Sequence, residues 1–119
     1  MCQQNAHGCW YGYWLECNGN GYRLAFRYEY RNRRIISKLK EYKPELIMVS
    51  AGFDAHREED QAQLLMVERD YAFLGRRLAS CKSEIPECRG VVAVLEGGYN
   101  TSSLARSCAA FIHQLACTD

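Results

Sequence analysis

The stretch LIMVSAGFDAH, residues 46–56, begins as an apolar run and ends in a glycine followed by a single carboxylate. Residues 46–50 have the length of one strand, and VVAVL, residues 91–95, forms a second run of the same kind. Continuous apolar runs of this length are typical of strands that are buried on both faces of a parallel sheet. We therefore expect two strands of the kind that is buried on both faces in a complete parallel sheet.

Three further segments carry apolar residues at the helical period: residues 33–42, 64–81 and 102–115. Pro44 ends the first of these helices, and Thr101 or Ser102 is expected to cap the third. Residues 83–90, which contain Pro86, are expected to form a loop. The side chains expected to face the core are Ile35, Ile36, Leu39, Leu65, Tyr71, Leu74, Leu78, Leu104, Cys108, Phe111, Ile112 and Leu115.

The order of these elements predicts an α/β fold with a partial parallel sheet. A strand, a helical crossover and a second strand imply a parallel pair. Strands as apolar as these require neighbouring strands at both edges and helices on both faces, and this chain has too few of either. The pattern therefore indicates a part of a larger α/β domain.

The bulk composition excludes several classes of partner. The chain has 119 residues, enough for one small domain, and a formal net charge of +1, so it has no electrostatic signature for nucleic acid or anionic membrane. The locally basic residues 31–43 are interpreted as a solvated helix face. No apolar run approaches the ~18 residues of a membrane span, and no signal peptide is visible. We expect a nuclear or cytoplasmic protein.

The cysteines and the first part of the chain carry little pattern. There are seven cysteines, and none forms a C-x-x-C pair. Cys2, His7, Cys9 and Cys17 have the spacing of no zinc module, so free thiols are expected. Residues 1–31 are rich in Gly, Asn, Trp and Tyr, and we interpret them as an irregular, divergent segment preceding a unit over residues 32–119.

Polar residues follow both expected strands. Asp54 comes after the first strand, and Tyr99 follows the second within Glu-Gly-Gly-Tyr-Asn. Ligands of open α/β sheets bind beyond the carboxyl ends of the strands, where these two residues would face one crevice. A carboxylate can hold a metal ion, and a tyrosine hydroxyl can donate to an oxyanion. An ordinary turn at each position explains the same residues, so both interpretations stay open here.

The segments PELIMVSAGFDAH, residues 44–56, and VLEGGYN, residues 94–100, resemble the C-terminal part of the histone deacetylase family. The resemblance is to the class II and bacterial-like branch, and it implies the three-layer α/β/α arginase/deacetylase fold. It implies that Asp54 is a zinc ligand, and that Tyr99 polarises the substrate carbonyl and stabilises the tetrahedral intermediate. Gly97, Gly98 and Gln61 would line the substrate channel, and His56 would be structural.

The reaction implied by this resemblance is zinc-dependent hydrolysis of an acetyl amide. The implied cofactor is Zn²⁺, and the implied substrate is an acetylated histone, another acetyl-lysine protein or an acetylpolyamine. No direct contact with nucleic acid or membrane is implied.

The sequence departs from the family pattern in ways that leave catalysis by this chain open. It contains neither the family's His-His pair nor an Asp-x-His segment upstream of Asp54. Glu59, Asp60 and Gln61 replace the usual Asp-Pro-Leu. We therefore expect the isolated chain to be incomplete and inactive, with an N-terminal deacetylase portion missing.

Two other interpretations of the sequence differ from that of a catalytic deacetylase. The first is a non-catalytic deacetylase-like module that binds another protein. The second is a flavodoxin-like protein, which the absence of a glycine-rich phosphate loop disfavours.

Overall fold

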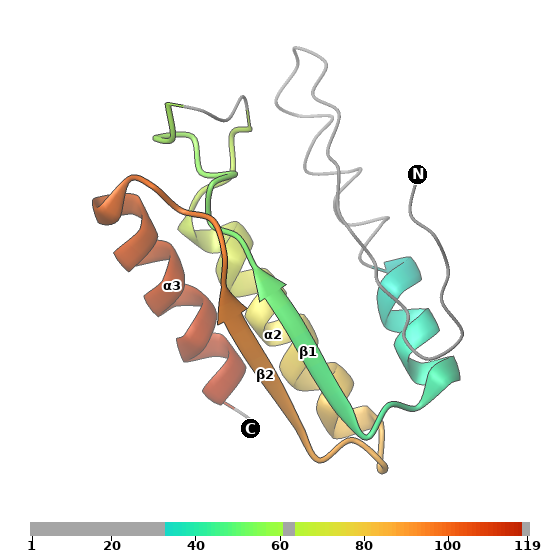
Figure 1. The fold of residues 1–119 in the computed structure, drawn as a ribbon. Helices are drawn as coiled ribbons and strands as arrows, with labels where there is room; N and C mark the ends of the chain where they lie inside the picture. Colours follow the sequence, from blue (N-terminus) through green and yellow to red (C-terminus); the bar gives the residue numbers. More distant parts are fainter. Residues whose placement is uncertain (1–32, 61–63, 118–119) are drawn as a thin grey trace.

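A computed structural model describes residues 33–60 and 64–117 of the chain, shown in Figure 1. A helix over residues 33–42 is followed by strand β1 (Leu46–Ala51), helix α2 (Glu68–Glu84), strand β2 (Gly90–Leu95) and helix α3 (Thr101–Ala116). The strands form a parallel pair in register from Leu46 opposite Gly90 to Ala51 opposite Leu95. The predicted α/β fold with a parallel pair is confirmed. Residues 1–31 and Gln61, on which other predictions fall, lie outside the described residues.

The start of helix α2 differs from the prediction of a helix over residues 64–81. Residues 64–67 are not helical: Met66 forms a parallel bridge with His56, and Val67, the N-cap, has an extended backbone. The Val67 N–H donates to Asp70 Oδ2 over 2.8 Å, and this contact ties the end of the extended segment to the first helical turn. Leu65 consequently lies outside the helix and is exposed, contrary to its predicted place in the core.

The predicted cap of helix α3 is also wrong. Asn100 is the N-cap, and its Oδ1 accepts hydrogen bonds from the N–H groups of Ser102 and Ser103, each over 3.1 Å. An asparagine side chain is short enough to reach both donors from the residue before the helix. The helix then turns Phe111 into the core and leaves Ile112, predicted to be buried, largely exposed.

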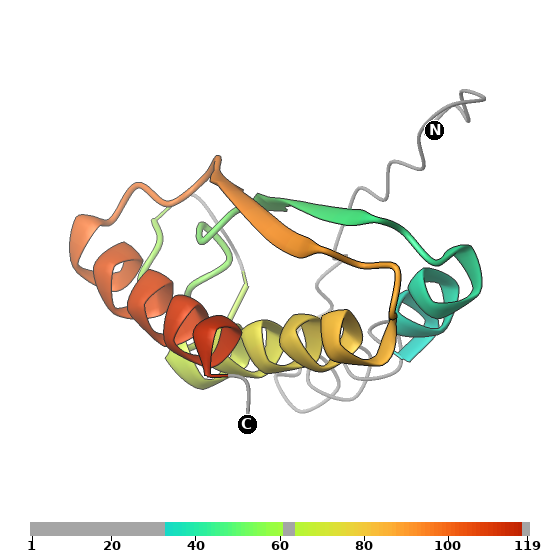
Figure 2. The ribbon, with the colours of Figure 1, turned by 90° about the horizontal axis from the view of Figure 1, so that it is seen from below.

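Within the described residues, the helices lie on one face of the sheet, as Figure 2 shows from below. Between this face and the helices lie two groups of buried side chains. One group consists of Ile36, Ile47, Cys81, Ile85 and Cys88, and the other consists of Phe53, Met66, Tyr71 and Phe111. The alternation along β1 places Ile47 inward and Met48 outward, where Met48 is 70% exposed.

One face of the strands is therefore uncovered within the described residues, which fits the predicted partial sheet. Val92, the partner of Met48 in the sheet, and Val94 are exposed as well. Within residues 33–60 and 64–117, no helix meets the length and hydropathy of a membrane span.

Candidate functional site

The carboxyl ends of the two strands are joined by backbone hydrogen bonds. The Phe53 N–H donates to Gly97 O over 2.7 Å, and the Glu96 N–H donates to Ala51 O over 3.0 Å. The segment carrying Asp54 and the segment carrying Tyr99 therefore leave the sheet side by side. This is the juxtaposition that the sequence predicts for neighbouring parallel strands.

The Asp54 carboxylate lies directly against Gly97. A Cβ atom added at Gly97 would lie 2.7 Å from Asp54 Cγ and 2.8 Å from Oδ2. A Cβ atom at Gly52 would lie 3.0 Å from Asp54 Oδ1. These two glycines form a cradle for the half-buried carboxylate that any side chain at position 97 would fill.

The next residue, Gly98, turns the chain toward helix α3. Its φ angle is 137°, in a region that L-residues rarely adopt. A Cβ atom there would also approach Leu104 Cδ1 to 2.8 Å. Tyr99 follows directly, and its side chain is 64% exposed, so packing against the described residues does not hold the phenol.

Glu59 holds this turn from the other side. The residue is only 5% exposed, and its Oε1 accepts from the N–H groups of Tyr99 and Asn100, each over 2.9 Å. Sequence reasoning recognised Glu59 only as a departure from the family's aspartate. The signal that could have found this contact is an acid in the same short loop as Asp54, opposite a turn with free N–H groups.

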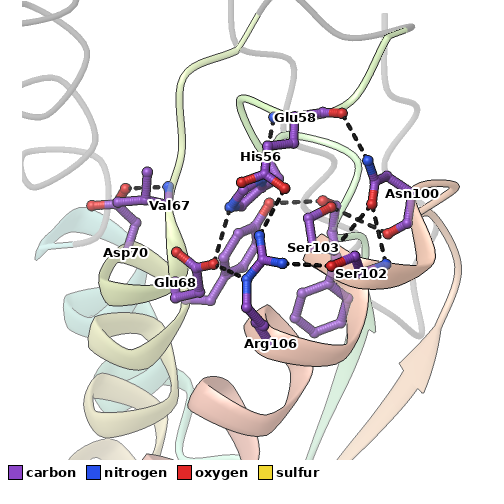
Figure 3. Close-up of polar contacts among 11 residues, drawn as sticks. His56, Glu58, Val67, Glu68, Asp70, Asn100, Ser102, Ser103 and Arg106 are labelled. Atoms are coloured by element: carbon purple, nitrogen blue, oxygen red, sulfur yellow. Dashed lines mark hydrogen bonds and ion pairs between the residues drawn. The ribbon is translucent and has the colours of Figure 1, made fainter.

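A second polar cluster, drawn in Figure 3, joins residues 52–60, which we call the Asp54 loop, to helices α2 and α3. Arg106 donates to Glu68 Oε1 over 2.6 Å, to Glu58 Oε2 over 2.7 Å and to Ser102 Oγ over 2.6 Å. The hydrogen bond from the Arg106 guanidinium lowers the pKa of Glu68 from 4.5 to about 2. Glu68 is therefore ionised at neutral pH and bound to helix α3.

His56 lies beside this cluster and is fully buried. Its Nδ1 accepts from the Glu58 N–H over 3.1 Å, so the proton of the neutral ring belongs on Nε2. Nε2 lies 3.6 Å from Glu68 Oε1. The surroundings of the ring fit the structural role implied for His56.

Tyr71 supports the same loop from helix α2. Its hydroxyl donates to Phe53 O over 3.0 Å, and its ring packs on the Phe53 ring with centroids 5.0 Å apart. Burial raises the pKa of Tyr71 above its ordinary value, so the hydroxyl keeps its proton and stays a donor. The residue before Asp54 is thus fixed by both its carbonyl and its side chain.

The described residues do not complete a metal site. Among them, no group of three or more His, Cys, Asp or Glu side chains is arranged to hold a metal ion. The donor type of Asp54 suits zinc, but catalytic zinc typically has three protein ligands. One carboxylate does not satisfy that requirement. Cys81, Cys88, Cys108 and Cys117 are free thiols, as expected.

The sequence of the chain matches the family model described as the histone deacetylase domain over residues 7–115. The chain belongs to the histone deacetylase family. It is similar to the type-2 histone deacetylase 1 of Dictyostelium discoideum, with 41% identity over 83 residues, which is 69% of this chain and 5% of that protein. It is also 36% identical over 76 residues, 63% of this chain and 10% of that protein, to the polyamine deacetylase HDAC10 of Danio rerio.

The fold of this histone deacetylase family member agrees with solved structures. The chain superposes on the crystal structure of the HDA15 HD domain with a TM-score of 0.65 and 25% identity, covering 83% of this chain and 26% of that one. This likeness confirms the predicted arginase/deacetylase fold. The chain spans about a quarter of the solved domain and a tenth or less of the two relatives named above.

Proposed function

We propose that this chain carries one part of a zinc-dependent deacetylase site, with Asp54 as a zinc ligand and Tyr99 as the oxyanion donor. The observation that carries the proposal is the contact between the two strand ends, where the Asp54 carboxylate lies against Gly97 in the turn that carries Tyr99. Gly97 and Gly98 would line the channel, together with Gln61. The remaining ligands and the proton-transfer group come from outside the described residues.

The roles of the two residues follow from their surroundings. The absence of a side chain at Gly97 and Gly52 leaves room for the Asp54 carboxylate beside the turn that carries Tyr99, where it could serve as a ligand. The exposed Tyr99 phenol is free to donate its proton in a hydrogen bond to a substrate carbonyl oxygen, and this bond strengthens as negative charge develops there. Zinc, when bound, would supply an activated water and a polarised carbonyl.

The substrate class we propose is an acetylated amine, either an acetyl-lysine side chain or an acetylpolyamine. Both kinds of name occur among the relatives, histone deacetylase in one and polyamine deacetylase in another. A nuclear or cytoplasmic location is proposed with it.

A non-catalytic role is the second candidate, and one observation favours it. Met48, Val92 and Val94 form an exposed apolar face on the sheet, which suits contact with another protein. Together with the lone metal ligand in the described residues, this face would make the chain a module that binds a deacetylase portion.

The deciding experiment isolates the native polypeptide that carries LEGGYNTSSLARS, residues 95–107, and measures its mass and its turnover. We expect hydrolysis of an acetyl-lysine peptide or an acetylpolyamine that stops when zinc is chelated. We expect Tyr99→Phe to lower kcat by about 10²–10³-fold with little change in KM, because one oxyanion donor is lost. Tyr42→Phe, which alters an exposed tyrosine on the helix over residues 33–42, is the matched control.

The outcomes separate the two candidates. Equal turnover in the Tyr99→Phe and Tyr42→Phe proteins would contradict the role of Tyr99. A polypeptide of this length that shows no turnover, but forms a stoichiometric complex with an intact deacetylase, would support the non-catalytic module.

A further inference from the structure

The proposed roles of Asp54 and Tyr99 do not yet say what the buried carboxylate of Glu59 contributes to function. Its Oε1 accepts two consecutive backbone N–H groups, those of Tyr99 and Asn100, each over 2.9 Å. We propose that Glu59 is a positioning residue. Its carboxylate fixes where the Tyr99 turn, residues 97–100, lies relative to Asp54. The inference rests on the proposed function in naming Tyr99 as the group that is positioned.

The first step of the argument is the cost of burying Glu59. A carboxylate that is only 5% exposed requires strong hydrogen bonds to compensate its lost hydration. Two N–H donors supply them, and both lie at the N-terminus of helix α3, where the helix dipole favours negative charge. The acceptor is therefore stable where it lies, and it constrains two adjacent peptide groups at once.

The second step is that the Tyr99 turn is bound to the Asp54 loop at both of its ends. On one side, the Phe53 N–H donates to Gly97 O over 2.7 Å. On the other side, Glu59 accepts from the turn, and Asn100 Nδ2 donates to Glu58 O over 3.2 Å. Without Glu59, the turn would keep the hydrogen bond at Gly97 O. It would lose the two hydrogen bonds that the N–H groups of Tyr99 and Asn100 donate to Glu59.

The third step concerns what else could hold Tyr99. Its side chain is 64% exposed, so its direction depends on the backbone from which it leaves. Gly98, the residue before it, has the backbone freedom of a glycine at φ 137°. Glu59 contacts the backbone of Tyr99 and not the phenol, and it is therefore a positioning residue and not a catalytic one.

The experiment measures amide hydrogen exchange by NMR on the full 119-residue chain. We expect Glu59→Ala to accelerate exchange of the Tyr99 and Asn100 amides by about tenfold or more, because a charged acceptor is lost. The Phe111 amide in helix α3 serves as the reference for global stability. Glu59→Gln keeps an oxygen at the same reach, and we expect it to restore most of the protection.

The matched control is Glu58→Ala. Glu58 precedes Glu59 in the chain, its side chain pairs with Arg106, and its carbonyl oxygen survives the substitution. We expect wild-type exchange at Tyr99 and Asn100 in this variant. If Glu59→Ala unfolds the chain, Glu59→Asp decides instead, because it keeps the charge but shortens the reach, and it should accelerate the same two amides.

Unchanged exchange at Tyr99 and Asn100 in Glu59→Ala, or in Glu59→Asp where that variant decides, would overturn the proposal, and so would a failure of Glu59→Gln to restore protection. These readouts need no turnover, so they stand whether or not the proposed deacetylase activity is found. In a polypeptide that does turn over substrate, the loss of kcat from Glu59→Ala should largely disappear on a Tyr99→Phe background. Additive losses would show that Glu59 does not act through Tyr99.

Discussion

At the scale of single residues, the candidate site depends on close contacts that leave no room for a side chain. Gly97 touches the Asp54 carboxylate, and Gly98 adopts a backbone conformation that suits glycine. Glu59 provides the opposite kind of constraint, an acceptor for two N–H groups. The neighbouring residues therefore leave room for the Asp54 carboxylate and bind the backbone of Tyr99.

Gly97→Ala should destabilise the chain by about 1–3 kcal/mol, because its Cβ would have to displace the Asp54 carboxyl group. The control is Gly90→Ala, since a Cβ atom at Gly90 would meet only Leu46 Cδ1 at 3.9 Å. Urea unfolding of the two variants measures the difference. Equal midpoints in both variants would contradict the cradle.

At the scale of elements, helices α2 and α3 pack closely through Gly75. A Cβ atom there would lie 2.3 Å from Phe111 O and 3.2 Å from Leu115 N, both backbone atoms of helix α3. At the other end of the pair, Arg106 on helix α3 binds Glu68 in the first turn of helix α2. The two helices are thus in close backbone contact at Gly75, and an ion pair joins them at Glu68.

Gly75→Ala should lower the free energy of unfolding by about 1–3 kcal/mol. Alanine raises helix propensity by about 1 kcal/mol over glycine, but the overpacking against a backbone that cannot yield outweighs that gain. Chemical denaturation gives the sign directly. A variant more stable than the wild type would mean that the two helices are not in contact at Gly75.

Arg106→Gln should remove a stabilisation that depends on pH. The pKa of Glu68 is about 2 in the folded chain against an ordinary value of 4.5, so the unfolded chain binds more protons between these pH values. The stabilisation is complete above about pH 5 and is lost as the pH falls toward 2. We expect only a small cost at pH 6, because both side chains of the pair are partly exposed to solvent.

Urea midpoints at pH 6, 4 and 3 test this expectation. The difference in urea midpoint between Arg106→Gln and the wild type should become smaller at each lower pH. It should also become smaller at pH 6 when salt is added. Arg57→Gln, at an exposed arginine of the Asp54 loop, controls for the loss of one positive charge. A difference that does not vary with pH would exclude Glu68 as the responsible group.

At the scale of the whole molecule, the described chain is a sheet with helices on one face. The other face presents Met48, Val92 and Val94, and the two strands are the whole of the described sheet. Apolar faces and unpaired strand edges of this kind associate with other surfaces. The solved HDA15 HD domain is about four times longer than the part that this chain matches.

We expect the purified chain to self-associate through this face as its concentration rises. Met48→Lys with Val94→Lys should shift it toward the monomer, because two charges would have to be desolvated in the contact. Ile112→Lys, at an exposed position on helix α3, is the matched control. Sedimentation velocity measures the change. If the double variant and the Ile112→Lys control associate equally, the contact lies on another surface.

The sequence by itself determined the two strands, the parallel pairing and the positions of Asp54 and Tyr99 at the strand ends. These follow from local pattern, since an apolar run specifies a strand and a helical crossover specifies a parallel neighbour. The predicted interior of the helices was mostly correct for the same reason. Tyr71 and Phe111 are buried, and Leu104 packs against them.

Only the tertiary structure decided how the site is held. Glu59 meets Tyr99 across 40 residues of sequence, and Arg106 meets Glu68 across 38. The late start of helix α2 depends on the bridge between His56 and Met66, and the exposure of Met48 depends on which layers are present. Local periodicity cannot reveal such features, because each of them is a contact between segments whose proximity arises only when the sheet and helices pack.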